Sequence, residues 1–227
     1  MKTIGLLGGT GWSSTITYYR MLNERVQERL GGYHSAKILL KSIDYHDIMR
    51  HYGKNHQAVA AILQQELSTF LPFKPDCLII CCNSLHKYYD DIASNLDITI
   101  PVFHAVHLVA DEIKQRHLQK VLLLATKFTM EDGFFARILE EQGIHVVIPN
   151  AEEREYMKNI HDELMQNQIH AKSQDYFEQL ISRHKNCDAV VLGCTEYSLL
   201  LNSSTLSLPI IDSACLQVRH AVDYALA

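Results

Sequence analysis

Short apolar runs alternate along the chain with longer stretches in which apolar residues recur three and four positions apart. The first pattern predicts strands, and the second predicts amphipathic helices. The expected helices span residues 14–30, 57–70, 105–116, 130–142, 153–167 and 173–183. The expected strands are centred on Ile4, Ile38, Ile79, Val102, Leu122, Val147, Val191 and Ile210.

The predicted strands are apolar throughout rather than alternating between apolar and polar residues. Such strands are typical of a parallel sheet that helices cover on both faces. Because strands and helices alternate along the chain, the pattern predicts an α/β fold. No low-complexity stretch interrupts the 227 residues, so any domain boundary is expected at a tight connection.

The sequence contains an internal repeat. DCLIICCNSL begins at Asp76 and DAVVLGCTEY begins at Asp188, and in each segment a cysteine follows six positions later, Cys82 or Cys194. Two predicted strands precede each segment, and a proline-led strand, IPVF or LPII, follows it. We therefore expect two similar α/β halves: residues 1–100 joined by a C-terminal helix at 213–227, and residues 101–212.

The repeat places one thiol at the carboxyl end of the third strand of each half. Parallel sheets bind ligands just beyond the carboxyl ends of their strands, where helix N-termini point N–H groups at the ligand. If the halves face each other across a pseudo-twofold axis, Cys82 and Cys194 approach one bound molecule from opposite sides. Two thiols on opposite faces of one carbon indicate proton transfer.

Composition narrows the class of partner. The formal charge is −5 and the pI is near 6.2, and no basic stripe suited to nucleic acid or to a membrane surface is present. We expect a small-molecule partner. The N-terminus lacks the pattern of a secretory signal, and no apolar stretch approaches the roughly 20 residues that cross a bilayer. A cytoplasmic location is the expectation, and there the six cysteines would not form a disulfide framework.

Four ordered motifs carry a resemblance to a known family. They are KTIGLLGG at the start, CCNSLH where the family has C-N-T-x-H, LLLAT ending at Thr126, and LGCTEYSLL with the G-C-T-E signature. On these motifs the chain resembles the cofactor-independent aspartate/glutamate racemase superfamily over essentially its whole length. The segment GGYHSAKILLKSIDYHDI is similar to the broad-specificity branch of that family.

The resemblance implies two Rossmann-like domains with an active site between them, no pyridoxal phosphate or other cofactor, no metal, and often a homodimer. It implies racemisation of an amino acid, aspartate or glutamate above all. One cysteine thiolate removes the Cα proton, and the other cysteine, as a thiol, protonates the opposite face. Carried over by position, the acid/base pair is Cys82 and Cys194.

Polar residues beside the two thiols are the candidates for binding the substrate. Near neutral pH a thiolate needs N–H groups or a helix N-terminus close by, and a carbanion next to a carboxylate needs dense donors. The candidates for these roles are Gly9, Thr10, Asn83, Ser84, Thr126, Thr195 and Glu196, together with Tyr52 of an altered side-chain pocket that includes Arg50 and His51. Asn83, Ser84 and Thr195 are equally interpretable as ordinary helix caps.

Two other functions stay open. Gly5, Gly8 and Gly11 follow the first strand, and Asp44 ends the second strand where a ribose-binding acid belongs, so nucleotide binding is one alternative. A non-catalytic binder of amino acids or other small acids on the same scaffold is the second. The nucleotide-binding alternative leaves the paired cysteines unexplained. His104 and His107 are three positions apart but lack the companion spacing of a metal site.

Overall fold

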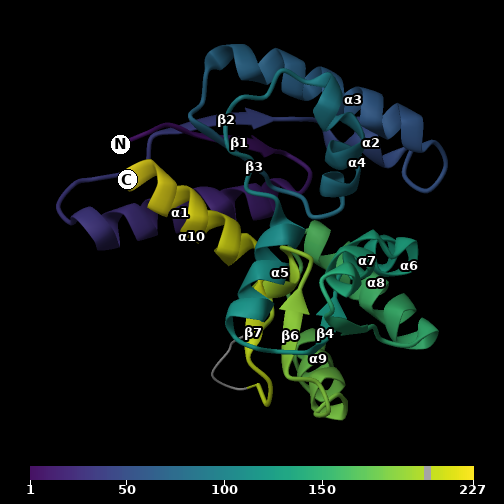
Figure 1. Ribbon diagram of the computed structural model, residues 1–227. Helices are drawn as coiled ribbons and strands as arrows, with labels where there is room; N and C mark the ends of the chain where they lie inside the picture. The colour runs from purple at the N-terminus through teal and green to yellow at the C-terminus, as the bar shows by residue number, and fades with distance from the viewer. Residues whose placement is uncertain (202–205) are drawn as a thin grey trace. The chain divides into compact units, whose positions relative to one another are not determined.

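The computed structural model describes residues 1–201 and 206–227. These residues form two compact units. The first unit comprises residues 1–105 and 214–227, and the second comprises residues 106–213. Each unit contains one parallel sheet with helices packed around it, so the predicted α/β fold is confirmed (Figure 1).

The first unit has a parallel sheet with the strand order β2-β1-β3. The strands are β1 (Ile4–Gly8), β2 (Ile38–Ser42) and β3 (Cys77–Ile80). The main helices are α1 (Trp12–Leu30), α2 (Tyr45–Met49), α3 (His56–Phe70), α4 (Leu85–Ile92) and α10 (Ser213–Leu226), with 3₁₀ turns η1 (Leu71–Phe73) and η2 (Ala93–Asn95).

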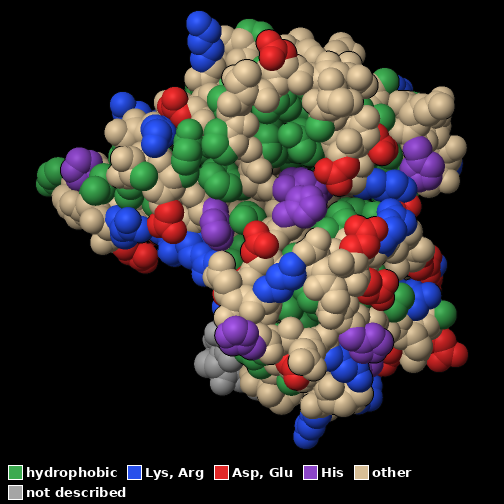
Figure 2. Space-filling view, in the orientation of Figure 1, with side chains coloured by type: hydrophobic (Ala, Val, Ile, Leu, Met, Phe, Trp, Pro, Cys, Tyr) green, Lys and Arg blue, Asp and Glu red, His purple; other side chains and the backbone are tan. Residues whose placement is uncertain are grey.

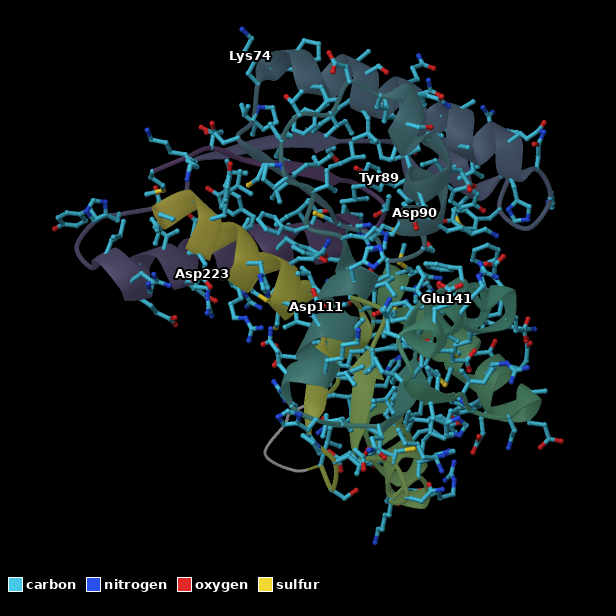
Figure 3. The ribbon with its side chains drawn as sticks, in the orientation of Figure 1. Lys74, Tyr89, Asp90, Asp111, Glu141 and Asp223 are labelled. Atoms are coloured by element: carbon cyan, nitrogen blue, oxygen red, sulfur yellow. The ribbon has the colours of Figure 1, made fainter. Side chains whose placement is uncertain are left out.

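Two apolar cores cover the two faces of this sheet. On one face, β1 and β3 pack against α1 and α10, which lie side by side in Figure 1. On the other face, Leu7, Leu78 and Ile80 pack against the helices α2, α3 and α4. An ion pair 2.6 Å long, from Arg29 to the Asp223 labelled in Figure 3, joins the exposed sides of α1 and α10.

The second unit has a four-stranded parallel sheet with the order β5-β4-β6-β7. The strands are β4 (Lys120–Leu124), β5 (His145–Val147), β6 (Ala189–Leu192) and β7 (Ile210–Asp212). Its helices are α5 (Ala105–Gln115), α6 (Lys127–Asp132), α7 (Phe134–Glu141), α8 (Ala151–Met165) and α9 (Ala171–Arg183), with the 3₁₀ turn η3 (Tyr197–Leu199). Each of α5, α7, α8 and α9 buries an apolar side completely.

The internal repeat of the sequence is also a repeat of hydrogen bonds. The Asp76 carboxylate accepts the Thr3 N–H at 2.6 Å, and the Asp188 carboxylate accepts the Gln119 and Lys120 N–H groups at 2.8 Å. Each aspartate therefore ties the start of its own strand to the start of the neighbouring strand. In both units the residue two positions after the aspartate, Leu78 or Val190, also donates its N–H to a proline carbonyl at 2.9 Å. The proline is the one in the IPVF or LPII segment that follows.

Two predicted elements differ in the structure. The strand expected around Val102 is reduced to a single bridge with Leu78, because the backbone turns at once and the His104 N–H bonds to the Val102 carbonyl. His104 consequently precedes α5, and its Nε2 lies 3.3 Å from Asp90, labelled on α4 in Figure 3. The helix expected over 130–142 is two helices, because Gly133 adopts a left-handed φ of 78° that ends α6.

Charged side chains of both signs are interspersed over the face of the molecule that Figure 2 presents. This mixture agrees with the modest net charge of the sequence. Among the described residues, no helix combines the length and the apolar character needed to cross a membrane.

Candidate active site

Cys82 lies just beyond the carboxyl end of β3. The Cys81 N–H donates to the Leu7 carbonyl at 2.9 Å, so β1 and β3 stay paired up to this point. The Cys81 side chain then turns into the core and is buried, whereas Cys82 is only partly buried. The Cys82 carbonyl accepts the N–H of Leu85, the first residue of α4, at 3.3 Å. The thiol of Cys82 therefore lies where the strand gives way to the helix.

A chain of hydroxyl groups runs from the Cys82 thiol. The Cys82 Sγ lies 3.3 Å from the Ser84 Oγ, and that oxygen lies 2.7 Å from the Tyr52 hydroxyl. Burial raises the pKa of Tyr52 well above its ordinary value, and the negative charge of a Cys82 thiolate raises it further. Tyr52 therefore stays protonated, and its O–H can donate to Ser84 while Ser84 donates to the sulfur.

Ser84 uses its side chain differently from an ordinary helix cap. It occupies the N-cap position of α4, but its hydroxyl makes no capping hydrogen bond and lies instead between Cys82 and Tyr52. Asn83 and Ser84 are both buried, and the Asn83 carbonyl accepts the His86 N–H at 3.2 Å. The interpretation of Ser84 as a cap is therefore wrong, because its hydroxyl bonds toward the thiol.

Gly9 and Thr10 follow β1 beside this thiol. Gly9 has a φ of 93°, and a Cβ at this position would lie 2.2 Å from the Ile43 carbonyl oxygen, so only glycine fits. The Gly9 N–H donates to the Thr15 hydroxyl at 2.9 Å. The buried Thr10 hydroxyl donates to the Cys81 carbonyl at 3.4 Å. This backbone turn therefore approaches the end of β3 closely.

Cys194 occupies the equivalent place in the second unit. The Gly193 N–H donates to the Leu124 carbonyl at 2.8 Å, as Cys81 does to Leu7 in the first unit. The Cys194 carbonyl accepts the Tyr197 N–H at 3.3 Å, and its side chain is buried. Thr195 was interpretable as a helix cap, but within the described residues only the 3₁₀ turn η3 follows.

The Cys194 thiol donates to a carboxylate. Its Sγ lies 3.1 Å from the Glu196 Oε2, which also accepts the Thr195 hydroxyl at 2.9 Å. Burial raises the pKa of Cys194 well above its ordinary value, and the Glu196 charge and hydrogen bond raise it further. Cys194 is therefore held as a neutral thiol.

His161 on α8 is a neighbour that sequence reasoning missed. Its Nε2 lies 4.0 Å from the Glu196 Oε2, and its ring packs edge-on against the Tyr197 ring. The only sequence signal was its place in a helix, far from the LGCTEY motif. The packing of α8 brings His161 beside the motif, and no local spacing could have indicated this.

Thr126 follows β4 as Cys194 follows the neighbouring β6. Leu124 pairs with Leu192, and the two site residues each come two positions later. The Thr126 hydroxyl accepts the Thr129 N–H at 3.2 Å, so Thr126 caps α6. This cap lies at the same end of the sheet as Cys194, and the structure thus brings these two predicted site residues to one edge.

Asp44 of the nucleotide-binding alternative and Arg50 of the predicted side-chain pocket both have structural partners. Asp44 caps α2, and its carboxylate accepts the His46 N–H at 3.0 Å. Arg50 is exposed and pairs with Asp47 at 3.3 Å, one turn away on the surface. A cap explains Asp44 without a nucleotide, and Arg50 does not join the group formed by Tyr52, Ser84 and Cys82.

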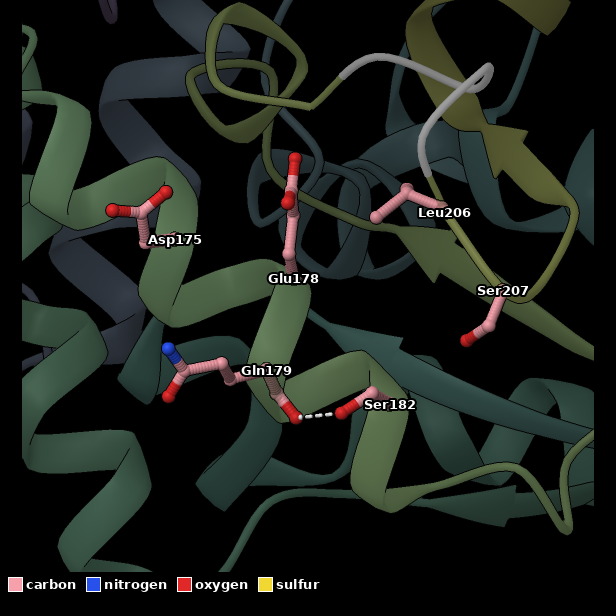
Figure 4. Close-up of a pocket in the computed structure, with 6 residues that line it drawn as sticks. All are labelled: Asp175, Glu178, Gln179, Ser182, Leu206 and Ser207. Atoms are coloured by element: carbon pink, nitrogen blue, oxygen red, sulfur yellow. Dashed lines mark hydrogen bonds between the residues drawn. The ribbon is translucent and has the colours of Figure 1, made fainter.

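A surface pocket of the second unit lies away from these strand ends. Figure 4 shows its lining residues, which come from α9 and from the segment before β7: Asp175, Glu178, Gln179, Ser182, Leu206 and Ser207. Residues that precede a strand lie at the opposite end of a parallel sheet from those that follow one. This pocket is therefore distinct from the Cys194 site.

The fold and the strand ends define an α/β protein with two parallel sheets and one cysteine beyond a strand of each. Over 100% of both chains, it is similar to the solved structure of a proposed Asp/Glu racemase from Yersinia pestis, with 37% identity and a TM-score of 0.87. An aspartate racemase homologue from Pyrococcus horikoshii is 29% identical, again over 100% of both chains, with a TM-score of 0.86.

Residues 7–221 match the family described as Asp/Glu/Hydantoin racemase, and the chain belongs to this family. The resemblance found in the sequence is thereby confirmed. A curated relative, the glutamate racemase of Aquifex pyrophilus, is 27% identical over 158 residues. That match covers 66% of this chain and 58% of the relative, so it spans less than two thirds of the relative's length.

Proposed function

We propose that the chain is a cofactor-independent amino-acid racemase that acts on aspartate, glutamate or both. The observation that carries this proposal is the equivalence of Cys82 and Cys194. Each lies two positions beyond a parallel strand, and each accepts the same backbone hydrogen bond at 3.3 Å from three residues on. Membership of the racemase family supports the substrate class.

The two thiols would exchange protons with the substrate Cα on opposite faces. In one direction the Cys82 thiolate takes the Cα proton as its S–H, and the resulting carbanion takes the proton of the Cys194 thiol. Cys194 is left as a thiolate and the configuration is inverted. The hydroxyl chain through Ser84 and Tyr52 supports Cys82 as the resting thiolate, and the Glu196 carboxylate supports Cys194 as the resting thiol.

The reverse direction requires Cys194 to act as the base. A thiolate next to the Glu196 carboxylate is unfavourable, because two negative charges would lie about 3.1 Å apart. We infer that in this direction Cys194 first passes its proton to Glu196 along the hydrogen bond from the Sγ to the Oε2, and that Cys82 starts as a thiol after taking a proton from solvent.

The substrate carboxylates would bind to the polar groups around these thiols. Gly9, Thr10 and Asn83 are the candidates in the first unit, and Thr126 and Thr195 are the candidates in the second. Negative charge develops on the carboxylate oxygens when the Cα proton leaves, so donors fixed in advance stabilise the transition state. Tyr52 and Ser84 would then serve both the thiol and the substrate.

Incubation of single enantiomers in D₂O without a cofactor tests this proposal. Proton NMR follows loss of the Cα proton of aspartate and glutamate, and polarimetry follows loss of optical rotation. We expect both signals to decay with the wild-type protein and with a Cys215→Ala control, whose thiol is exposed on α10. The proposal would be contradicted if neither amino acid exchanged its Cα proton, or if Cys82→Ala exchanged it at the wild-type rate. Ligand binding without exchange would favour the non-catalytic binder.

A further inference from the structure

Three different metal-ligating side chains converge in the second unit. They are His161 from α8, and Cys194 and Glu196 from the turn after β6, and one ligand atom of each lies within 4.8 Å of the others. The Sγ to Oε2 distance is 3.1 Å, and the Nε2 to Oε2 distance is 4.0 Å. Cys194 is 4% exposed and Glu196 is 6% exposed, so two of the donors are already withdrawn from solvent.

These separations are close to those of a tetrahedral zinc site. Bonds of about 2.0–2.3 Å from zinc to nitrogen, oxygen and sulfur place the ligand atoms roughly 3.3–3.7 Å apart. The two observed distances, 3.1 and 4.0 Å, lie on either side of this range. Small side-chain rotations would therefore bring the three atoms onto one ion, with a fourth position left for water.

The neighbours of His161 suit a ligand as well. Its Nδ1 lies 4.0 Å from the Asp162 carboxylate while its Nε2 is directed at Glu196, and the Tyr197 ring packs against the imidazole. Metal-bound histidines commonly have a carboxylate at their second nitrogen, which orients the ring and raises its basicity. His161 is also the most exposed of the three donors, with 21% of its side chain accessible.

We propose that His161, Cys194 and Glu196 form a binding site for a divalent transition-metal ion of the Zn²⁺ type. On binding, a metal–sulfur bond forms, the thiol proton leaves to solvent, and the hydrogen bond from Cys194 to Glu196 breaks. The inference that the ion inhibits the protein rests on the proposed function, because the ion would withdraw both Cys194 and Glu196 from proton transfer. Zinc would then act as a reversible inhibitor that a chelator removes.

The Cys82 site offers a matched comparison. Its thiol has the hydroxyls of Ser84 and Tyr52 as partners rather than an imidazole and a carboxylate. Neutral hydroxyls are poor ligands for zinc, which prefers thiolate, imidazole and carboxylate. A Cys82→Ser variant should therefore keep the metal site, whereas Cys194→Ser should lose its sulfur ligand.

Titration of the reduced, chelator-treated protein with Co²⁺ tests the site without reference to activity. We expect a sulfur-to-cobalt charge-transfer band and the intense visible bands of four-coordinate cobalt, saturating at one ion per chain and displaced by Zn²⁺. Cys82→Ser and Cys215→Ser should keep the charge-transfer band, and Cys194→Ser should lose it. His161→Ala should weaken binding by about tenfold or more. Circular dichroism confirms that each variant is folded.

Several outcomes would overturn the site. These are a folded wild-type protein that gives no charge-transfer band, a band that survives in Cys194→Ser, or unchanged affinity in His161→Ala. In the wild-type protein the rate of Cα proton exchange should fall when Zn²⁺ is added and recover when a chelator removes it. Metal binding without any exchange would remove the proposed function alone, and exchange without metal binding would remove this inference alone.

Discussion

The side chains around Cys82 and Cys194 differ, although the backbone hydrogen bonds just before and after the two cysteines correspond. The Cys82 thiol is partly exposed and lies 3.3 Å from a neutral hydroxyl, whereas the Cys194 thiol is buried and lies 3.1 Å from a carboxylate. The second arrangement keeps Cys194 as a thiol. The hydroxyl beside Cys82 suits the thiolate that the proposed mechanism requires there. A repeated fold thus supplies two equivalent positions, and the neighbouring side chains give them different chemical surroundings.

The largest effect should come from replacing each thiol separately. Cys82→Ser and Cys194→Ser should each lower racemisation by about 10²–10⁴-fold, the usual contribution of a general acid or base. Each variant keeps one thiol and should still exchange the Cα proton of one enantiomer, a different one in each case. Deuterium incorporation into each pure enantiomer measures this. Both variants exchanging the same enantiomer would refute the assignment of one thiol to each face.

One glycine lies beside each cysteine, Gly9 in the turn after β1 and Gly193 directly before Cys194, and the two should differ in their tolerance of alanine. Gly9→Ala combines a left-handed φ with a Cβ 2.2 Å from a carbonyl oxygen, and should lower the free energy of unfolding by at least about 2 kcal/mol. Gly193→Ala meets only side chains, at 3.1–3.2 Å, and should cost about 1 kcal/mol. Urea unfolding measures both values, and equal losses would contradict the distinction.

The hydroxyl chain at Cys82 should matter through the stabilisation of that thiolate during proton transfer. Ser84→Ala removes the donor to the thiolate and should lower the exchange rate about 10–100-fold, since hydrogen bonds to charged groups contribute about 1.5–3 kcal/mol. Tyr52→Phe should show the same loss with a smaller amplitude. Deuterium incorporation into each pure enantiomer measures both rates, and a wild-type rate in Ser84→Ala would show that the hydroxyl does not support the thiolate.

The last effect appears only at alkaline pH and concerns stability. Cys194 has a raised pKa in the folded state, so above the unfolded value of about 8.5 only the unfolded chain releases this proton, and stability falls as pH rises. Cys194→Ala should make this fall shallower by up to about 1.4 kcal/mol per pH unit. Urea unfolding at several pH values, from about 8 to about 10, compares the slopes of the two proteins. An unchanged slope in Cys194→Ala would argue against a protonated thiol.

Much of this arrangement could be predicted from the sequence. The spacing from Asp76 to Cys82 and from Asp188 to Cys194 indicated two equivalent strand ends, because apolar runs and their polar ends are local signals. The apolar character of the strands likewise indicated the parallel sheets. The break at Gly133 had a local signal as well, since a glycine inside a helical pattern commonly ends a helix.

Other features depend on contacts between distant segments. His161 reaches Glu196 only through the packing of α8, and Tyr52 reaches Ser84 from a loop that precedes α3. The direction of the Ser84 hydroxyl was also beyond the sequence, because a serine before a helix ordinarily caps it. The strand predicted around Val102 does not form, because the backbone turns after one bridge. This is a tertiary effect that the apolar pattern does not encode.

The Asp76 carboxylate has a consequence at the far end of its strand. With the Thr3 N–H bound to its side chain and the Thr3 carbonyl bound to its own N–H, Asp76 fixes the register of β3 against β1. A slip by one residue would turn every side chain of β3 to the opposite face of the sheet. It would then present Cys81 in place of Cys82. The choice between two adjacent cysteines is thus made by an aspartate at the opposite end of the same strand.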